Sequence, residues 1–200
     1  VFVWQPSDPN CTSEFAGGIS RSLAKGIKAS GLYVRASLER FREFAKSHIR
    51  ISNERDETIV IRPQTFLLAA VKPKPLTLYF EYPSWVSYQL IKAAANYSPA
   101  VFPAERSVVR SGTGRTVATI DSPDQTAKRE IEEMYGRVTQ AALQHSATIM
   151  PNSLKECQLR AGQMVEGDVY FEGSDKTRDV ILRVFLGDSA FEIPFSIPKR

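Results

Sequence analysis

Few residues of this sequence have side chains that catalyse reactions or bind metals. The two histidines are His48 and His145, and the methionines Met150 and Met164 follow His145. Imidazole and thioether groups together suit Cu(I), so a copper site built from His145, Met150 and Met164 is one hypothesis. The competing interpretation is structural, because methionine commonly fills gaps in a core and histidine at a helix C-terminus favours the helix dipole. His48 with acidic neighbours would be a second route to a metal or catalytic pocket.

The glycine-rich segment 111–116 (SGTGRT) superficially suggests phosphate binding. A P-loop requires the pattern G-x-x-x-x-G-K-[ST] between a strand and a helix, and this segment has neither the spacing nor the lysine. The sequence also lacks the G-x-S-x-G turn that presents a catalytic serine. Adjacent acids such as Glu132 and Glu133 fall on a predicted helix face, where we interpret them as solvated charges. We therefore predict no catalytic residue, no cofactor and a non-enzymatic protein.

The two cysteines, Cys11 and Cys157, belong to no C-x-x-C pair, so a zinc knuckle is not indicated. Two interpretations remain, namely one long-range disulfide in an exported protein or two buried thiols. Cys11 lies in the polar, proline-containing segment QPSDPNCTS, whereas buried free cysteines usually lie in apolar runs. We therefore expect a Cys11–Cys157 disulfide by a small margin.

Aromatic residues are dense in the segment 78–90 (LYFEYPSWVSYQL), which contains Tyr79, Tyr82, Trp85 and Tyr88. Such a cluster is a recognition patch if it is exposed, because Tyr and Trp dominate binding energy at interfaces. Packing between a strand and a helix is the commoner use of such residues. We take the four side chains as the candidate interaction surface.

Composition limits the class of partner. The chain has 200 residues, of which 42% are hydrophobic and 24% charged, so it can bury a core. The net charge is +4, and acids are interleaved with bases, as in the segment 39–46, whereas a nucleic-acid interface would cluster its bases. The longest apolar run, 66–71, is far shorter than the ~20 residues that span a bilayer. We expect no nucleic-acid partner and no membrane span.

The alternation of residue types predicts a mainly β protein. Ile49 and Ile51 share one face of the first run, and Ile59 and Ile61 share one face of the second. The polar segment 53–58 lies between the two runs, and all four isoleucines are expected to point inward. This pattern predicts a β-hairpin with paired strands at 49–52 and 58–62. The last quarter alternates in the same way around a tight turn at 187–189, with inward positions at Val180, Leu182, Val184, Leu186, Phe191, Ile193, Phe195 and Ile197. Short strands separated by turn signals favour a β-sandwich.

Two helices interrupt this pattern, at about 85–96 and 123–146. The second has an apolar stripe at three- and four-residue spacing, which predicts docking onto a sheet; it comprises Ala127, Ile131, Met134, Tyr135, Val138, Ala142 and Leu143. Residues 1–30 look like a partly irregular N-terminal extension, in which the spacing of Ile19, Leu23 and Ile27 suggests a helical face. Residues 31–200 form the predicted single β-sandwich domain with helical insertions.

The C-terminal pattern resembles that of exported bacterial immunoglobulin-like β-sandwich domains of uncharacterised function. The matching residues are Leu159, Gly162, Gly167, Val169, Tyr170, Phe171, Leu182, Val184, Gly187, Phe191 and Phe195. The segment 48–61, with Asn53 at the turn, is similar to their early strand–turn–strand unit, and the resemblance covers about half of the chain. Ala161 departs from the pattern, which has proline there. The resemblance implies an Ig-like fold and an extracytoplasmic location (periplasmic, secreted or envelope-anchored), and it carries over no catalytic residue.

These observations predict a non-enzymatic, extracytoplasmic β-sandwich that binds another protein or an envelope component. The other hypothesis is a copper-type metal-handling protein or an enzyme whose site is assembled from distant loops.

Overall fold

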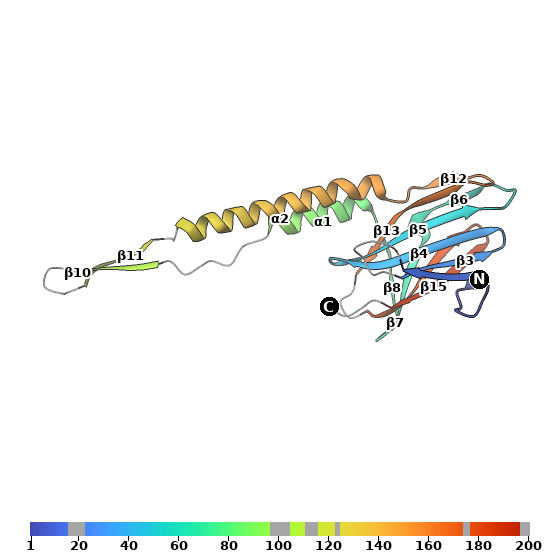
Figure 1. The fold of residues 1–200 in the computed structure, drawn as a ribbon, viewed down its shortest axis with the longest axis horizontal. Helices are drawn as coiled ribbons and strands as arrows, with labels where there is room; N and C mark the ends of the chain where they lie inside the picture. The colour runs from blue at the N-terminus through green and yellow to red at the C-terminus, as the bar shows by residue number, and fades with distance from the viewer. Residues whose placement is uncertain (16–22, 97–104, 111–115, 123–124, 174–176, 197–200) are drawn as a thin grey trace. The chain divides into compact units, whose positions relative to one another are not determined.

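The computed structural model describes residues 1–15, 23–96, 105–110, 116–122, 125–173 and 177–196 (Figure 1). The chain is mainly β with two helices, and it divides into two compact units. The first, which we name the β unit, comprises Val1–Val86 and Thr148–Arg200. The second, which we name the insert, is Ser87–Ala147.

One sheet of the β unit has six antiparallel strands in the order β2-β3-β4-β5-β13-β9. Their bounds are β2 (Cys11–Phe15), β3 (Leu23–Ala29), β4 (Leu32–Phe41), β5 (Phe44–Asn53), β13 (Met164–Glu172) and β9 (Phe80–Glu81).

The other sheet has five strands in the order β1-β15-β14-β7-β8, of which only the β1–β15 pair is parallel. Their bounds are β1 (Phe2–Val3), β15 (Ser189–Ser196), β14 (Asp179–Leu186), β7 (Leu67–Lys72) and β8 (Leu76–Leu78). A separate antiparallel ladder joins β6 (Ile59–Ile61) to β12 (Cys157–Leu159), and a 3₁₀ turn, η1 (Pro63–Thr65), follows β6.

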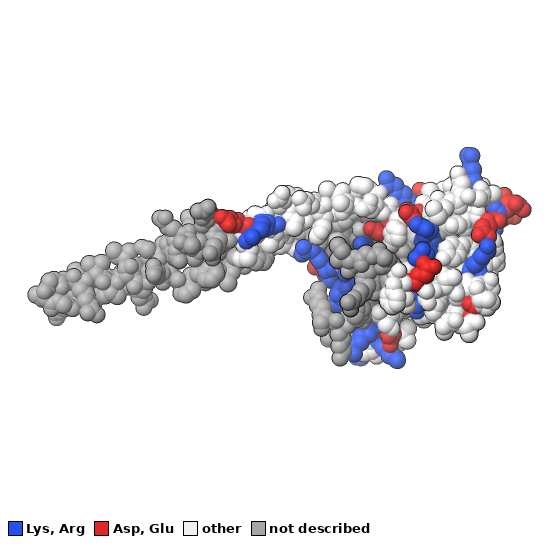
Figure 2. All heavy atoms as spheres, in the orientation of Figure 1, with Lys and Arg blue, Asp and Glu red and all other residues white. Residues whose placement is uncertain are grey.

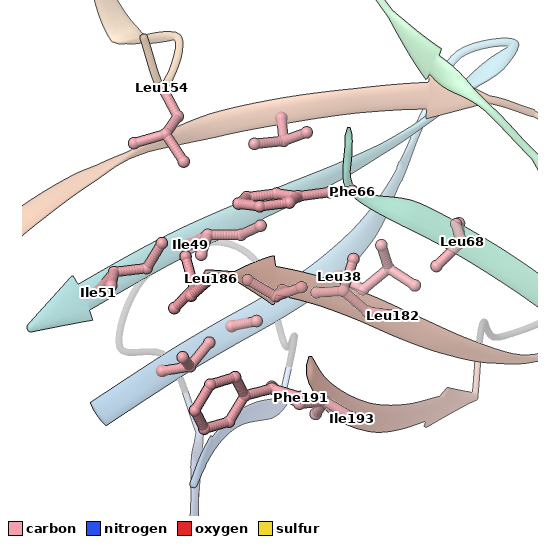
Figure 3. Close-up of a cluster of buried hydrophobic side chains, with 14 of the residues drawn as sticks. Leu38, Ile49, Ile51, Phe66, Leu68, Leu154, Leu182, Leu186, Phe191 and Ile193 are labelled. Atoms are coloured by element: carbon pink, nitrogen blue, oxygen red, sulfur yellow. The ribbon is translucent and has the colours of Figure 1, made fainter. Parts of the chain in front are cut away.

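Both sheets contribute side chains to one hydrophobic cluster (Figure 3). Ile49 and Ile51 of β5 lie on the same side of the cluster as Phe66, and Leu182 of β14 and Phe191 of β15 come from the other sheet. All five are fully buried. Removing each such side chain from water stabilises the fold by ~1.5–3 kcal/mol. The alternation predicted for the last quarter is confirmed from Val180 to Phe195, since every inward position there is buried; Ile197 lies outside the described residues.

The predicted hairpin between 49–52 and 58–62 is wrong, although its four isoleucines are buried as expected. Strand β5 pairs with β4 and β13, whereas β6 pairs with β12. The polar loop between them is held by Asn53, whose buried side-chain amide donates to the carbonyl oxygens of Glu57 at 2.7 Å and Leu159 at 2.9 Å. Its Oδ1 accepts from the Arg55 amide at 3.0 Å. These bonds carry the chain towards β12 instead of folding it back onto β5.

The first 30 residues are not an extension, because β1, β2 and β3 are strands of the two sheets. Of the three residues whose spacing suggested a helix, Leu23 and Ile27 belong to β3, which pairs with β2 and β4, and Ile19 lies outside the described residues. Ser30 and Gly31, with φ of 48° and 67°, form the two-residue turn that joins β3 to β4. Consecutive positive φ values are the signature of a type I′ hairpin turn, for which glycine is favoured.

The helices occur where the sequence predicts them, as α1 (Pro83–Ala95) and α2 (Gln125–Asn152), and α2 continues beyond the expected end. The insert also contains the antiparallel pair β10 (Glu105–Arg110) and β11 (Thr116–Ser122). Within the insert, the Ser87 and Ser146 hydroxyls share a hydrogen bond of 2.5 Å, so the start of α1 lies beside the end of α2 and the helices are antiparallel. Residues 111–115 of the glycine-rich segment lie outside the described residues.

Within the β unit, β13 makes a close backbone crossing with the segment that follows α2. A Cβ on Gly167 would lie 2.5 Å from the backbone nitrogen of Leu154. That nitrogen donates to the Asp168 carbonyl oxygen at 2.9 Å, and the Leu154 side chain is buried in the cluster. Glycine is required here because any side chain would push the two backbones apart.

Candidate interaction surface

The four aromatic side chains singled out in the sequence are all exposed. The exposed fractions are 59% for Tyr79, 64% for Tyr82, 46% for Trp85 and 52% for Tyr88. Tyr79 follows β8, Tyr82 follows β9, and Trp85 and Tyr88 belong to α1. Core packing, the commoner use of such residues, is therefore not their role in this fold.

Backbone and core contacts fix the segment that carries these rings. Phe80, between Tyr79 and Tyr82, packs against the hydrophobic cluster and meets the Tyr82 ring edge-on at 5.2 Å. The Tyr79 carbonyl oxygen accepts from the Glu172 amide at 2.9 Å. The Trp85 amide donates to the Tyr82 carbonyl oxygen at 2.9 Å, in the first turn of α1. The tyrosines are thus held outward by an anchored strand.

Two carboxylates lie beside the first tyrosine. Partial burial raises the pKa of Glu81, and the nearby negative charge of Glu172 raises it further. The Glu172 carboxylate also lies 3.4 Å from the Tyr79 backbone nitrogen. This end of the surface therefore carries acidic as well as aromatic side chains.

Charges on the six-stranded sheet are arranged as cross-strand pairs. His48 and Arg50 of β5 contact Asp168 and Glu166 of β13, at 2.9 Å and 2.6 Å respectively. The hydrogen bond that the protonated His48 ring donates to the Asp168 carboxylate raises the pKa of His48, against an opposing effect of burial. Similar pairs join Arg35 to Glu14 and Lys46 to Glu39. Figure 2 shows blue and red side chains close together over the face in view. The acids expected near His48 are present, but on an exposed sheet face.

The three residues of the copper hypothesis lie on two elements, α2 and β13, and all are exposed. His145 and Met150 belong to α2, and Met164 begins β13, with exposed fractions of 50% for Met150 and 55% for Met164. Across the part of the chain that the structure describes, no group of three His, Cys, Asp or Glu side chains is arranged to hold a metal ion.

The expected Cys11–Cys157 disulfide is not formed, and both cysteines are free thiols. Cys11 begins β2 at an edge of the six-stranded sheet, while Cys157 begins β12, whose ladder with β6 is separate from that sheet. Each thiol is half-buried against the hydrophobic cluster, which is closer to the second interpretation, two buried thiols. Burial raises the pKa of the Cys157 thiol and so lowers its reactivity.

Sequence reasoning missed a clamp formed by Trp4 and Lys25. The Trp4 amide donates to the Glu192 carbonyl oxygen, and its indole Nε1 donates to Thr12. The Lys25 ammonium lies 4.1 Å from the Trp4 ring centroid and donates to the Pro194 carbonyl oxygen at 2.6 Å. Partial burial lowers the pKa of this lysine. The clamp joins β15 of one sheet to β2 at the edge of the other sheet, which is a structural role. The apolar start VFVW was the only signal of this clamp in the sequence.

No protein-family model, curated protein or solved structure matches this chain. Among the described residues, no helix has the length and apolar character needed to cross a membrane.

Proposed function

We propose that this chain is a non-enzymatic binding module that captures another protein, or a protein component of the cell envelope, through the surface formed around Tyr79, Tyr82 and Trp85. The observation that carries the proposal is the exposure of these rings on an anchored backbone. Tyr and Trp are enriched at protein interfaces, because they bring large contact area at low conformational entropy.

The charge beside the rings favours a partner with basic residues. Burial and the negative charge of Glu172 raise the pKa of Glu81. A cation bound there would offset the repulsion between the two carboxylates. The rings of Tyr79 and Tyr82 would in turn receive the stem of an arginine or lysine. A basic and apolar segment of a partner protein fits this chemistry.

The resemblance supports an Ig-like fold and an extracytoplasmic location. Its glycines occupy turns and close crossings: Gly162, with φ of 72°, donates its amide to the Asn53 carbonyl oxygen at 2.7 Å, and Gly187, with φ of 57°, joins β14 to β15. Its apolar positions, among them Val169 and Phe171, are buried. These are packing and turn roles, so they support a shared fold and assign no reaction.

Site-specific photo-crosslinking in the host cell tests the proposal. A photoreactive phenylalanine analogue at Tyr82 should yield discrete adducts with one protein, and adding Glu81→Lys should abolish them. The matched control places the same analogue at Arg183, whose side chain is 42% exposed on β14, and it should not yield those adducts. Unchanged melting temperatures would show that the fold is retained. Equal adducts at both positions, or none at Tyr82, would contradict the proposal.

A further inference from the structure

Among its described side chains, the insert exposes more large apolar residues than it buries. Its buried hydrophobic residues in the described part of the chain are Leu90, Ala94 and Ala142. Its exposed large hydrophobic residues are Tyr88 (52%), Ile91 (41%), Tyr135 (38%) and Leu143 (51%). Two helices form a single layer, and a stable core requires a second layer packed against the first.

Ile91 and Leu143 lie on the same side of the helical pair. Ile91 follows the buried Leu90 by one residue in α1, and Leu143 follows the buried Ala142 by one residue in α2. One residue rotates a side chain by about 100° around the helix axis. Because the helices are antiparallel, the same rotation along each chain turns both side chains to one common side of the pair.

The same part of the insert is poor in charge. The segment 138–147 of α2 contains no Asp, Glu, Lys or Arg, and Lys92 is the only charged residue of α1. Depletion of charge is the compositional signature of an interface core. A lipid surface is a poorer occupant, since helices that lie on membranes carry several Lys or Arg residues along their polar face.

We infer that the insert packs against the insert of a second copy of this chain, through the side that carries Ile91 and Leu143. A second copy supplies an identical helical pair with the same uncharged segment 138–147, and two such hairpins form a four-helix arrangement with a shared core. A self-complementary contact of this kind closes with two-fold symmetry and brings no like charges together along 138–147.

The area of this face sets the expected affinity of the dimer. Within the insert, the part of α2 with known side-chain exposure, 132–147, is about 24 Å long, and the part of α1, 87–95, is about 14 Å long. With each helix about 10 Å wide, the face covers roughly 400 Å² per copy. Specific interfaces bury ~800 Å² per partner, so this one belongs at the weak end. A reversible dimer with a Kd of the order of micromolar is expected.

Sedimentation equilibrium of the full chain tests this inference. The unmodified protein should pass from monomer to dimer as its concentration rises from about 1 µM to about 200 µM. Leu143→Gln and Ile91→Gln should each weaken the dimer at least about tenfold, because they place a polar group at the contact. Glutamine is a good helix former, so far-UV circular dichroism should be unchanged.

Leu76→Gln is the matched control, since Leu76 is 52% exposed on β8 of the β unit. It should leave the dimer intact. A protein that stays monomeric up to about 200 µM would overturn the inference. The inference would also fail if Leu76→Gln weakened the dimer as much as Leu143→Gln, or if neither helical substitution weakened it.

Discussion

The β unit and the insert differ in how much of their apolar surface is buried. In the β unit, the two sheets enclose a cluster to which nearly every inward position of β4, β5, β14 and β15 contributes. In the insert, the described helices bury only Leu90, Ala94 and Ala142. The β unit therefore has an enclosed hydrophobic core, whereas the helices of the insert leave an apolar side that a further layer can cover.

Polar groups follow the same division. Three turns of the β unit are tied together by Arg55, which donates to the Ser30 carbonyl oxygen at 2.6 Å and to the Ser189 hydroxyl at 2.8 Å. Its amide donates to the buried Asn53. In the insert, by contrast, Thr139 has a buried hydroxyl with no hydrogen-bond partner, and it is the only such side-chain atom among the described residues. Among the described residues of the β unit, every buried side-chain nitrogen or oxygen therefore has a hydrogen-bond partner.

The largest difference should appear on truncating one buried side chain in each unit. Ile51→Ala should lower the free energy of unfolding of the β unit by ~2–5 kcal/mol, because it leaves a cavity in a fully enclosed core. Leu90→Ala should leave the unfolding of the β unit unchanged, since it truncates a contact of the insert. Urea denaturation monitored by hydrogen exchange of β4 and β5 measures both. Equal destabilisation of β4 and β5 by the two substitutions would show that the units share one cooperative core.

The same glycine substitution should have opposite effects in the two units. Gly167→Ala should destabilise the β unit by ~1–3 kcal/mol, because its Cβ would lie 2.5 Å from the Leu154 nitrogen. Gly136→Ala should stabilise α2 by about 1 kcal/mol, because nothing lies within 4 Å of the added Cβ and alanine has the higher helix propensity. Thermal unfolding followed by far-UV circular dichroism distinguishes them. A neutral Gly167→Ala would contradict the close crossing.

The sequence predicts which face of a strand is buried better than it predicts the partner strand. Alternation identified the inward residues of β14 and β15, and it identified Ile49, Ile51, Ile59 and Ile61. It could not show that β5 and β6 pair with other strands, because the bonds of Asn53 to Leu159 span 106 positions of the chain. The helices were recognisable because their apolar periodicity is long, whereas three residues around β3 imitated a helical period by chance.

The candidate surface was located by composition, but its exposure could not be derived from composition. Tyr79 lies outward because its neighbour Phe80 takes the inward place, and Tyr82 lies just beyond the end of the short edge strand β9. Such a choice depends on the strands that surround a segment. The Trp4–Lys25 clamp was likewise out of reach, since Lys25 and Pro194 are 169 positions apart.

The smallest expected effect concerns pH. Because the pKa of His48 is raised by Asp168, the protonated pair stabilises the β unit below the unfolded pKa of about 6.5, and this contribution is lost as the pH rises through the raised value. The His48 side chain is 50% exposed, so the contribution should stay below about 1 kcal/mol. His48→Gln should reduce the change of the urea midpoint with pH between about pH 5.5 and about pH 8.5. If the urea midpoint changed equally with pH in the unmodified protein and in His48→Gln, the pH dependence would come from other groups.

Hydrogen exchange at two protein concentrations tests the contrast between the units most directly. At about 1 µM, amides of α1 and of 132–147 should exchange at least about tenfold faster than those of β4 and β5. At about 200 µM, the helical amides should gain protection while the strands stay unchanged, because association covers the insert alone. Helical amides that are as slow as the strands at both concentrations would contradict the account, since the insert would then be complete without a partner.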